Sequence, residues 1–123
     1  MRIDYAIVFV HDMKKSIAFY RDVIGLPLKF ETPHWTEFAT EGSTLALHAA
    51  DEPNPDPEPV DDLPAGRCRT GFCVPDLDAF HDRMLRHNVP CLQPPKEQFG
   101  ARLAQYVDPD GMVISVSQSR PGK

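Results

Sequence analysis

The chain has 123 residues, of which 41% are hydrophobic and 25% charged, and its formal net charge is −5. That charge argues against a nucleic-acid partner, and no apolar run approaches the roughly 18 residues that span a membrane. The three cysteines do not have the spacing of a zinc site, and the sequence does not open with a basic, apolar leader. We therefore predict a cytoplasmic protein with reduced thiols.

The first half of the chain predicts a strand followed by a helix. Tyr5 to Val10 is rich in β-branched and aromatic residues, as strands are. Asp12 can cap a helix by accepting hydrogen bonds from its first backbone amides. Gly25 then supplies a left-handed end, and the expected apolar face of the helix consists of Ile17, Phe19, Tyr20, Val23 and Ile24.

The second half repeats this pattern. Cys68 to Val74 predicts a strand, Asp76 is the expected helix cap, and Asn88 takes the place of Gly25. The expected apolar face of the second helix consists of Leu77, Phe80, Met84 and Leu85. The histidines at the helix start and on the second helix are expected to face solvent: His11, His81 and His87.

Three further strand-like stretches follow each helix, so each half predicts a βαβββ module. The last strands are Thr44–His48 and Val113–Ser117, in which Leu45, Leu47, Ile114 and Val116 suit a core facing the helix. The alternate residues then face a concavity: Ala46, His48, Ser115 and Ser117. We therefore predict an α+β fold in which modules 1–50 and 67–118 form one domain, 1–123, with a curved mixed sheet and a concave cleft.

The segment 51–66 between the modules holds five prolines and six acidic residues. This composition resists both helix formation and strand pairing, and it favours a solvated linker. Two alternatives stay open: the segment could be a lid over the cleft, or a hinge that lets modules exchange between two chains.

Two motifs carry a resemblance to a known family. The run from Val10 to Leu26, VHDMKKSIAFYRDVIGL, resembles the first-helix signature of the vicinal oxygen chelate superfamily, which includes glyoxalases, bleomycin-resistance proteins and extradiol dioxygenases. The sequence Phe99 to Arg102, followed by Asp108 to Gly111, resembles its closing motif. The resemblance covers nearly the whole chain and implies the paired fold, but the superfamily hosts many activities.

The resemblance also implies four metal-ligand positions, one on the first and one on the last strand of each module. They fall at Tyr5, Ala46, Arg69 and Ser115. None of these is a good ligand for a divalent metal, because arginine stays protonated, alanine has no donor atom, and the hydroxyl groups are weak donors. His48, two residues beyond Ala46, is a weak candidate for a displaced metal site, or could contact a ligand or act in proton transfer.

Other side chains suit ligand binding without a metal. Arg69 could hold a carboxylate, phosphate or enolate oxygen, or could instead form a salt bridge with an acidic neighbour such as Glu37. Tyr5 could donate a hydrogen bond to a ligand or fill the cleft. Aromatic walls are expected from four residues, with the choice between the first two open because the strand parity is uncertain: Trp35, Phe38, Phe9 and Tyr106.

Three functions from different classes follow. The first is a protein that binds a small, partly aromatic or anionic molecule without a metal, with Tyr5, Trp35, His48, Arg69, Tyr106 and Ser115 as ligand-binding residues. The second is a lyase, isomerase or dioxygenase, either with a displaced metal at His48 or with Arg69 and Tyr5 stabilising an oxyanion. The third is a non-catalytic association module. The resemblance further implies a homodimer.

Overall fold

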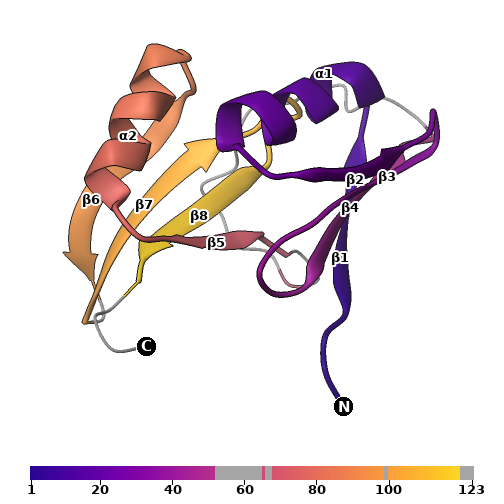
Figure 1. Cartoon of the computed structure of the whole chain (residues 1–123). Coiled ribbons are helices and arrows are strands. Elements are labelled where there is room, and N and C mark those ends of the chain that lie inside the picture. Colours follow the sequence, from indigo (N-terminus) through magenta and orange to yellow (C-terminus); the bar gives the residue numbers. More distant parts are fainter. Residues whose placement is uncertain (52–64, 66–67, 99, 120–123) are drawn as a thin grey trace. The chain divides into compact units, whose positions relative to one another are not determined.

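The computed structural model describes residues 1–51, 65, 68–98 and 100–119. The chain divides into two compact units, Met1–Asp56 and Pro57–Lys123 (Figure 1). Each unit runs in the order strand, helical segment and three strands, so the two predicted βαβββ modules are confirmed. Apart from residues 51 and 65, the segment 51–66 lies outside the described residues, and the roles considered for it stay predictions.

The first module contains one four-stranded sheet in the order β1-β4-β3-β2. Strands β1 and β4 run parallel, and the other neighbours run antiparallel. A strand, two consecutive helical segments and three more strands make up the module: β1 (Tyr5–Val10), α1 (Met13–Ala18), η1 (Phe19–Ile24), β2 (Leu28–Glu31), β3 (Trp35–Phe38) and β4 (Thr44–Ala49).

The second module has the same topology, with strand order β5-β8-β7-β6 and β5 parallel to β8. The predicted first strand is shorter than expected, because pairing begins at Gly71 rather than at Cys68. The elements are β5 (Gly71–Val74), α2 (Leu77–Arg86), β6 (Cys91–Gln98), β7 (Ala101–Val107) and β8 (Val113–Gln118).

Both helix starts and both helix ends follow the sequence prediction. An Asp12 side-chain oxygen accepts from the amide of Lys15 at 3.1 Å, and Asp76 accepts from the amide of Ala79 at 3.1 Å. Gly25, with φ of 99°, and Asn88, with φ of 56°, are left-handed. Side-chain capping and a left-handed residue satisfy backbone groups that a helix end would leave without partners.

The first helical segment differs from the prediction, because it turns from an α-helix into a π-helix at Phe19. The amides of Gly25 and Leu26 both donate to the carbonyl of Tyr20, at 3.2 and 2.9 Å. A π turn shifts the residues that face the sheet relative to a 3.6-residue period. Phe19 and Tyr20, at the start of the π-helical segment, are both buried as predicted.

The second helix packs its apolar face on β6, β7 and β8. Leu77, Phe80 and Met84 are buried, but the side chain of Leu85 is 53% exposed. The expectation that Leu85 belongs to the apolar face is wrong. One residue along an α-helix corresponds to a rotation of about 100°, which takes Leu85 away from the sheet once Met84 faces it.

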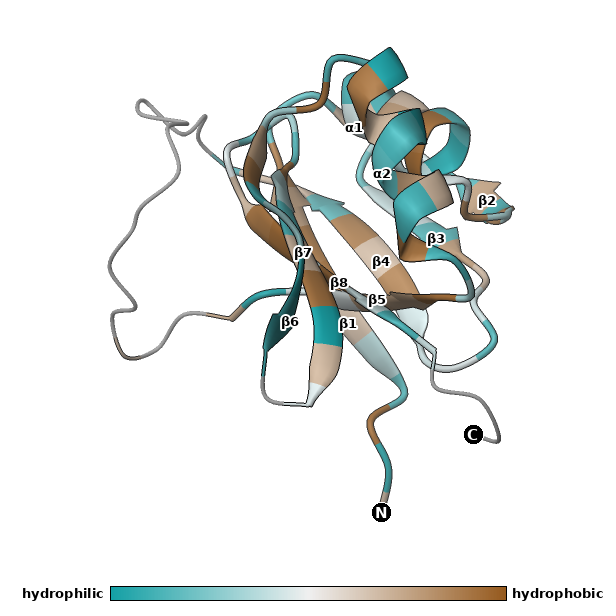
Figure 2. Ribbon diagram, turned by 90° about the vertical axis from the view of Figure 1, so that its left-hand side faces the viewer, coloured by the Kyte–Doolittle hydropathy of each residue, from teal (hydrophilic) through white to brown (hydrophobic). Residues whose placement is uncertain are grey.

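One face of each sheet packs on the helical segment, and the residues along the strands alternate accordingly (Figure 2). Leu45 and Leu47 of β4, and Ile114 and Val116 of β8, are buried as predicted. Along β1, Val8 and Val10 are buried while the alternate residues are exposed: Tyr5, Ile7 and Phe9. The face of β1 turned away from the helical segment is thus aromatic and apolar.

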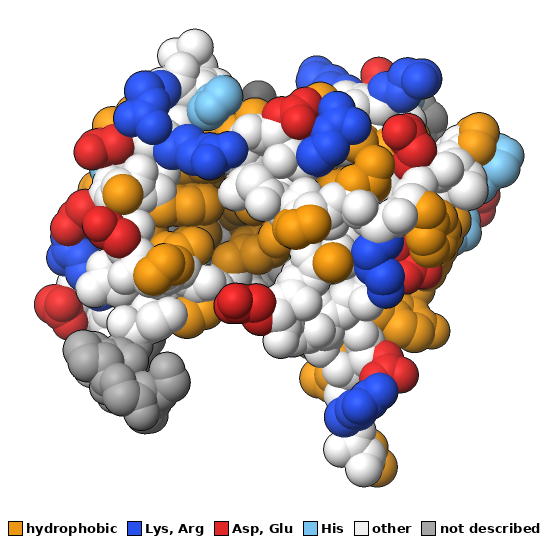
Figure 3. All heavy atoms as spheres, in the orientation of Figure 1, with side chains coloured by type: hydrophobic (Ala, Val, Ile, Leu, Met, Phe, Trp, Pro, Cys, Tyr) orange, Lys and Arg blue, Asp and Glu red, His pale blue; other side chains and the backbone are white. Residues whose placement is uncertain are grey.

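Charges of both signs are distributed over the surface. On the face presented in Figure 3, acidic and basic side chains are interspersed, with hydrophobic atoms exposed between them. Among the described residues, no helix combines the length and the hydrophobicity that crossing a bilayer requires.

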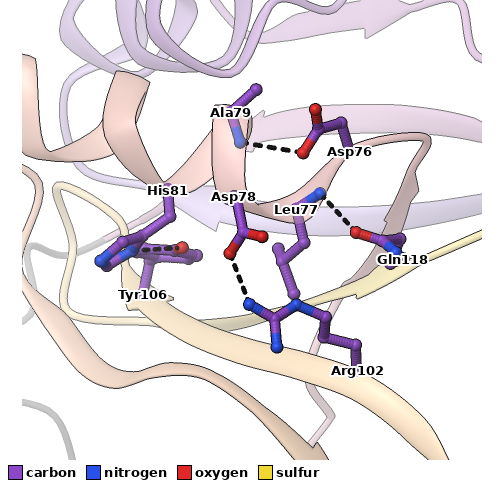
Figure 4. A network of polar contacts seen from close by, with 8 residues as sticks. All are labelled: Asp76, Leu77, Asp78, Ala79, His81, Arg102, Tyr106 and Gln118. Carbon is purple, nitrogen blue, oxygen red and sulfur yellow. Dashed lines mark hydrogen bonds and ion pairs between the residues drawn. The ribbon is translucent and has the colours of Figure 1, made fainter.

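A polar network lies between α2 and β7 (Figure 4). Tyr106, which has no exposed area, bonds through its hydroxyl group to Nδ1 of His81 at 2.9 Å, and Asp78 forms an ion pair with Arg102. His81 is half-buried, which corrects the expectation that it faces solvent. Burial raises the pKa of the Tyr106 hydroxyl above its usual value, with smaller effects of the same sign from Cys91 and Asp78.

Met84 and Leu85 offer a direct test of how α2 packs. Met84→Ala should lower the free energy of unfolding by about 2–5 kcal/mol, because it empties a fully buried position. Leu85→Ala should stay within about 0.5 kcal/mol of the unchanged protein, because its side chain is mostly in water. Urea unfolding followed by circular dichroism measures both values, and similar losses in the two variants would contradict the observed rotation of the helix.

Tyr106 should make the fold sensitive to alkali. Because its pKa is raised in the folded state, its contribution to stability is complete below about pH 10, the ordinary tyrosine value. This contribution is lost as the pH rises toward the folded-state pKa. Urea unfolding at a series of pH values from about 9 to 11 should show a decline in stability.

The control is Tyr106→Phe, which cannot ionise. Its stability should be lower at neutral pH, because His81 loses its partner, but it should fall less steeply with rising pH. Equal slopes for the two proteins would show that the hydroxyl of Tyr106 does not cause the alkaline decline.

Candidate ligand-binding faces of the two sheets

The open face of the first sheet, turned away from α1 and η1, carries residues that the register places side by side. Ile7 of β1 pairs with Ala46 of β4, and Phe9 pairs with His48. His48 also pairs with Trp35 of β3. Directly paired residues point to the same face of a sheet, so these five side chains share the open face.

Four rings form a continuous cluster on this face, which we call the aromatic cluster: Tyr5, Phe9, Trp35 and His48. The ring centroids of Tyr5 and Trp35 are 6.4 Å apart, those of Trp35 and His48 are 6.0 Å apart, and those of Phe9 and His48 are 5.4 Å apart. Tyr5 is 55% exposed and Phe9 is 63% exposed. The choice between Trp35 and Phe38 is also resolved, because Phe38 is fully buried on the helix side.

Glu37 holds the indole ring of Trp35 in place. The Nε1 atom of Trp35 donates to Oε2 of Glu37 at 2.8 Å, and Nζ of Lys29 lies 3.5 Å from the other carboxylate oxygen. The side chain of Glu37 is only 23% exposed. Charge-assisted hydrogen bonds of this kind are stronger than neutral ones, so the carboxylate fixes the orientation of the ring.

A hydrogen bond to the backbone determines which ring nitrogen of His48 carries the hydrogen. Its Nδ1 lies 2.6 Å from the carbonyl oxygen of Ala49, and because a carbonyl only accepts, Nδ1 carries the hydrogen. In the neutral ring Nε2 is then the acceptor nitrogen, the form that can accept a hydrogen bond or bind a metal.

A pocket of about 640 Å³ adjoins the aromatic cluster and lies wholly within the first module. Its volume falls within the range of about 300–1,000 Å³ that is usual for sites of small organic ligands. The residues that line it come from the N-terminal segment, β1, β3 and the turn before β4: Arg2, Ile3, Asp4, Tyr5, Trp35, Glu37, Gly42, Ser43 and Thr44.

The open face of the second sheet has a different chemistry. Gly71 of β5 pairs with Ser115 of β8, Ser115 with Gln105 of β7, and Gln105 with Gln93 of β6. These residues form a polar row across the sheet. Arg69 lies two residues before Gly71, just outside β5.

A pocket of about 410 Å³ lies at this polar row. Two basic and two amide side chains line it, together with apolar residues of β6: Arg69, Lys96, Gln93, Gln105, Leu92, Pro94 and Pro95. A smaller pocket of about 290 Å³ extends along β5 and is lined by Gly71, Phe72, Cys73, Leu103, Ser115 and Ser117.

The structure does not bring Tyr106 to either open face. It lies on β7 with the opposite parity to Gln105, is fully buried, and bonds to His81 of α2. The expectation that Tyr106 lines the concavity as a ligand-binding residue is therefore wrong. Its aromatic ring belongs to the core between α2 and the sheet, where it contacts Phe80.

The four positions suggested by the family's metal site form two diagonal pairs, one in each module. Tyr5 pairs with Thr44, two residues before Ala46, and Arg69 precedes Gly71, the partner of Ser115, by two residues. Ala46 is buried and offers no donor atom, and Arg69 carries a positive charge, so these residues do not fit a divalent cation. In the described part of the chain, no three His, Cys, Asp or Glu side chains come together to hold a metal ion.

Three residues that line these pockets were not among the ligand-binding candidates of the sequence analysis: Glu37, Lys96 and Gln105. Alternation from buried Thr36 and Phe38 would have placed Glu37 beside Trp35, had the parity of that strand been known. Lys96 follows an irregular stretch of β6, where register shifts break the simple alternation. No motif marks it.

Several known proteins resemble the chain over most of its length. An uncharacterized protein of Bacillus subtilis, YraH, is 26% identical and covers 89% of this chain and 91% of its own. The solved structure of TnmS3, an antibiotic-binding protein from Streptomyces sp. CB03234, is 26% identical with a TM-score of 0.73, covering 98% and 97% of the two chains. A glyoxalase/dioxygenase from Nostoc punctiforme shows the same fold, with 21% identity, a TM-score of 0.82, and coverage of 97% and 91%.

The family model of the glyoxalase/bleomycin resistance protein/dioxygenase superfamily matches residues 2–116. The match spans both βαβββ modules and therefore bears out the resemblance stated from the two sequence motifs. The chain belongs to the glyoxalase/bleomycin resistance protein/dioxygenase superfamily.

Proposed function

We propose that the protein binds a small, partly aromatic molecule on the open face of its first sheet, without the metal ion used by enzymes of the superfamily. The observation that carries this proposal is the aromatic cluster of Tyr5, Phe9, Trp35 and His48 beside a pocket of about 640 Å³. Tyr5 and Phe9 are exposed, and Trp35 and His48 are half-buried. Rings that present edges and faces, with few polar groups among them, suit a flat organic ligand.

The comparison with TnmS3 supports a binding role. That protein is described as antibiotic-binding, and it is similar to this chain over nearly its whole length. The superfamily also contains enzymes, so membership alone does not decide between binding and catalysis. The four metal-ligand positions of the family favour a binding protein over a metal enzyme, because they lack the carboxylate and imidazole groups that hold catalytic metals. Here they are occupied by Tyr5, Ala46, Arg69 and Ser115.

Two observations favour other functions. The Nδ1 hydrogen bond of His48 leaves Nε2 as the acceptor, which suits a displaced metal site and hence a lyase, isomerase or dioxygenase. Exposed Ile7 and Phe9 on β1, an edge strand of its sheet, suit an association module. The homodimer and the cytoplasmic location expected from the sequence stay predictions.

Trp35 is the only tryptophan of the chain, so its fluorescence reports on the aromatic cluster alone. Phenylnaphthylamine, a neutral aromatic probe, should quench Trp35 emission in a saturable titration. Phe9→Ala should weaken this binding about three- to tenfold, because an aromatic contact contributes roughly 0.5–1.5 kcal/mol. Leu85→Ala removes another exposed apolar side chain, from α2, and should leave the affinity unchanged.

Absence of saturable quenching, or equal effects of the two substitutions, would refute a specific site at the cluster. If the probe fails to bind, sedimentation equilibrium of the unchanged protein and of Phe9→Ala distinguishes an association surface, since only such a surface would make the oligomeric state depend on Phe9.

Glu37 is expected to act as a positioning residue, through the indole ring that it holds. Glu37→Ala should shift Trp35 emission and weaken probe binding about threefold or more, because the ring loses its hydrogen-bond acceptor. Glu37→Gln keeps an acceptor oxygen and should restore most of the affinity and the emission spectrum. If Glu37→Gln behaves like Glu37→Ala, the charge rather than the hydrogen bond to Trp35 is responsible.

A further inference from the structure

We infer that Arg69 and Lys96 of the second module bind a small oxyanion, either a carboxylate or a phosphate. The site is the pocket of about 410 Å³ on the open face of the second sheet. All the residues that line this pocket belong to the second module, and none of them is part of the aromatic cluster.

The charges that line the pocket are of one sign. Arg69 and Lys96 are its two charged residues, and no acidic side chain is among the described residues that line it. This is unexpected in a chain with a net charge of −5. Two cations that share one concave pocket attract an anion more strongly than either does on an open surface.

The pocket also offers hydrogen-bond donors in suitable number. A guanidinium group carries five N–H donors in a planar fork, so Arg69 can serve an oxyanion alongside other partners. Lys96 contributes an ammonium group, and Gln105 contributes an amide with two donors. Nε2 of Gln93 turns toward Gln98 and the carbonyl of Leu103, at 3.4 and 3.5 Å, so Gln93 forms part of the pocket wall.

The irregular course of β6 explains why the pocket exists. The register of β6 against β7 shifts between Gln93 and Lys96, where Pro94 and Pro95 lie. Proline has no amide hydrogen and interrupts a strand ladder, so it is placed on edge strands and at bulges. The bulge changes the local direction of β6, and Lys96 still reaches the open face, where it pairs with Leu103.

The test uses the whole chain, whose mass of 13.8 kDa suits two-dimensional amide NMR. Sodium phosphate and sodium acetate are titrated separately at constant ionic strength, because general screening must not vary. We expect saturable shifts of the amides around Arg69, Lys96 and Gln105 with one of the two anions. Saturation by phosphate identifies a phosphoryl ligand, and saturation by acetate identifies a carboxylate.

Two variants and a matched control make the test specific. Arg69→Gln should weaken binding of the saturating anion about tenfold or more, and Lys96→Gln should weaken it severalfold, since charged hydrogen bonds are lost. Arg86→Gln removes the same charge from an exposed position on α2, outside the pocket, and should leave the affinity unchanged.

Linear, non-saturating shifts with both anions, or an equal loss of affinity in Arg86→Gln, would overturn the inference. The amide spectrum of each variant verifies that the module remains folded. Phenylnaphthylamine carries no charge, so its quenching of Trp35 should not need the guanidinium of Arg69 and should be unchanged in Arg69→Gln. A failure of the anion pocket can then be told apart from a failure of the aromatic cluster.

Discussion

Each module has one helical segment for a four-stranded sheet, and this constraint determines where binding residues can lie. A sheet has two faces, and α1 with η1, or α2, can cover only one of them within the module. The strands therefore place apolar residues toward the helix, while the alternate residues are left on an open face. The side chains on the open face do not pack in the core of the module, so they are available for binding.

Much of the fold could be predicted because it depends on local signals that repeat. Asp12 and Asp76 cap the helices, and Gly25 and Asn88 end them, as their side chains and backbone freedom dictate. What the sequence could not show were features set by packing. The first helical segment changes from an α-helix to a π-helix at Phe19, which its apolar pattern does not reveal, and Leu85 points to solvent because Met84 takes the place against the sheet.

The site was predictable where strand parity was clear and not where it was uncertain. His48 follows Leu47 on a regular strand, so the sequence predicts that its side chain lies on the open face. For Trp35 the face follows only from its pairing with His48. The prediction that Tyr106 binds a ligand was wrong, because its buried hydroxyl group bonds to His81 of α2. No local sequence pattern reveals this partner. The two modules differ on their open faces: aromatic rings gather on the first, and basic and amide side chains line a pocket on the second.

We propose that this member of the superfamily binds its ligand through side chains instead of a metal ion. The most direct measurement is elemental mass spectrometry of the purified, untagged protein, combined with thermal unfolding in zinc, nickel, manganese or ferrous iron. We expect far less than one equivalent of any metal and no change in the unfolding temperature. Close to one equivalent of a single ion, with stabilisation by that ion that disappears in His48→Ala, would contradict the claim and make a metal-dependent enzyme the better explanation.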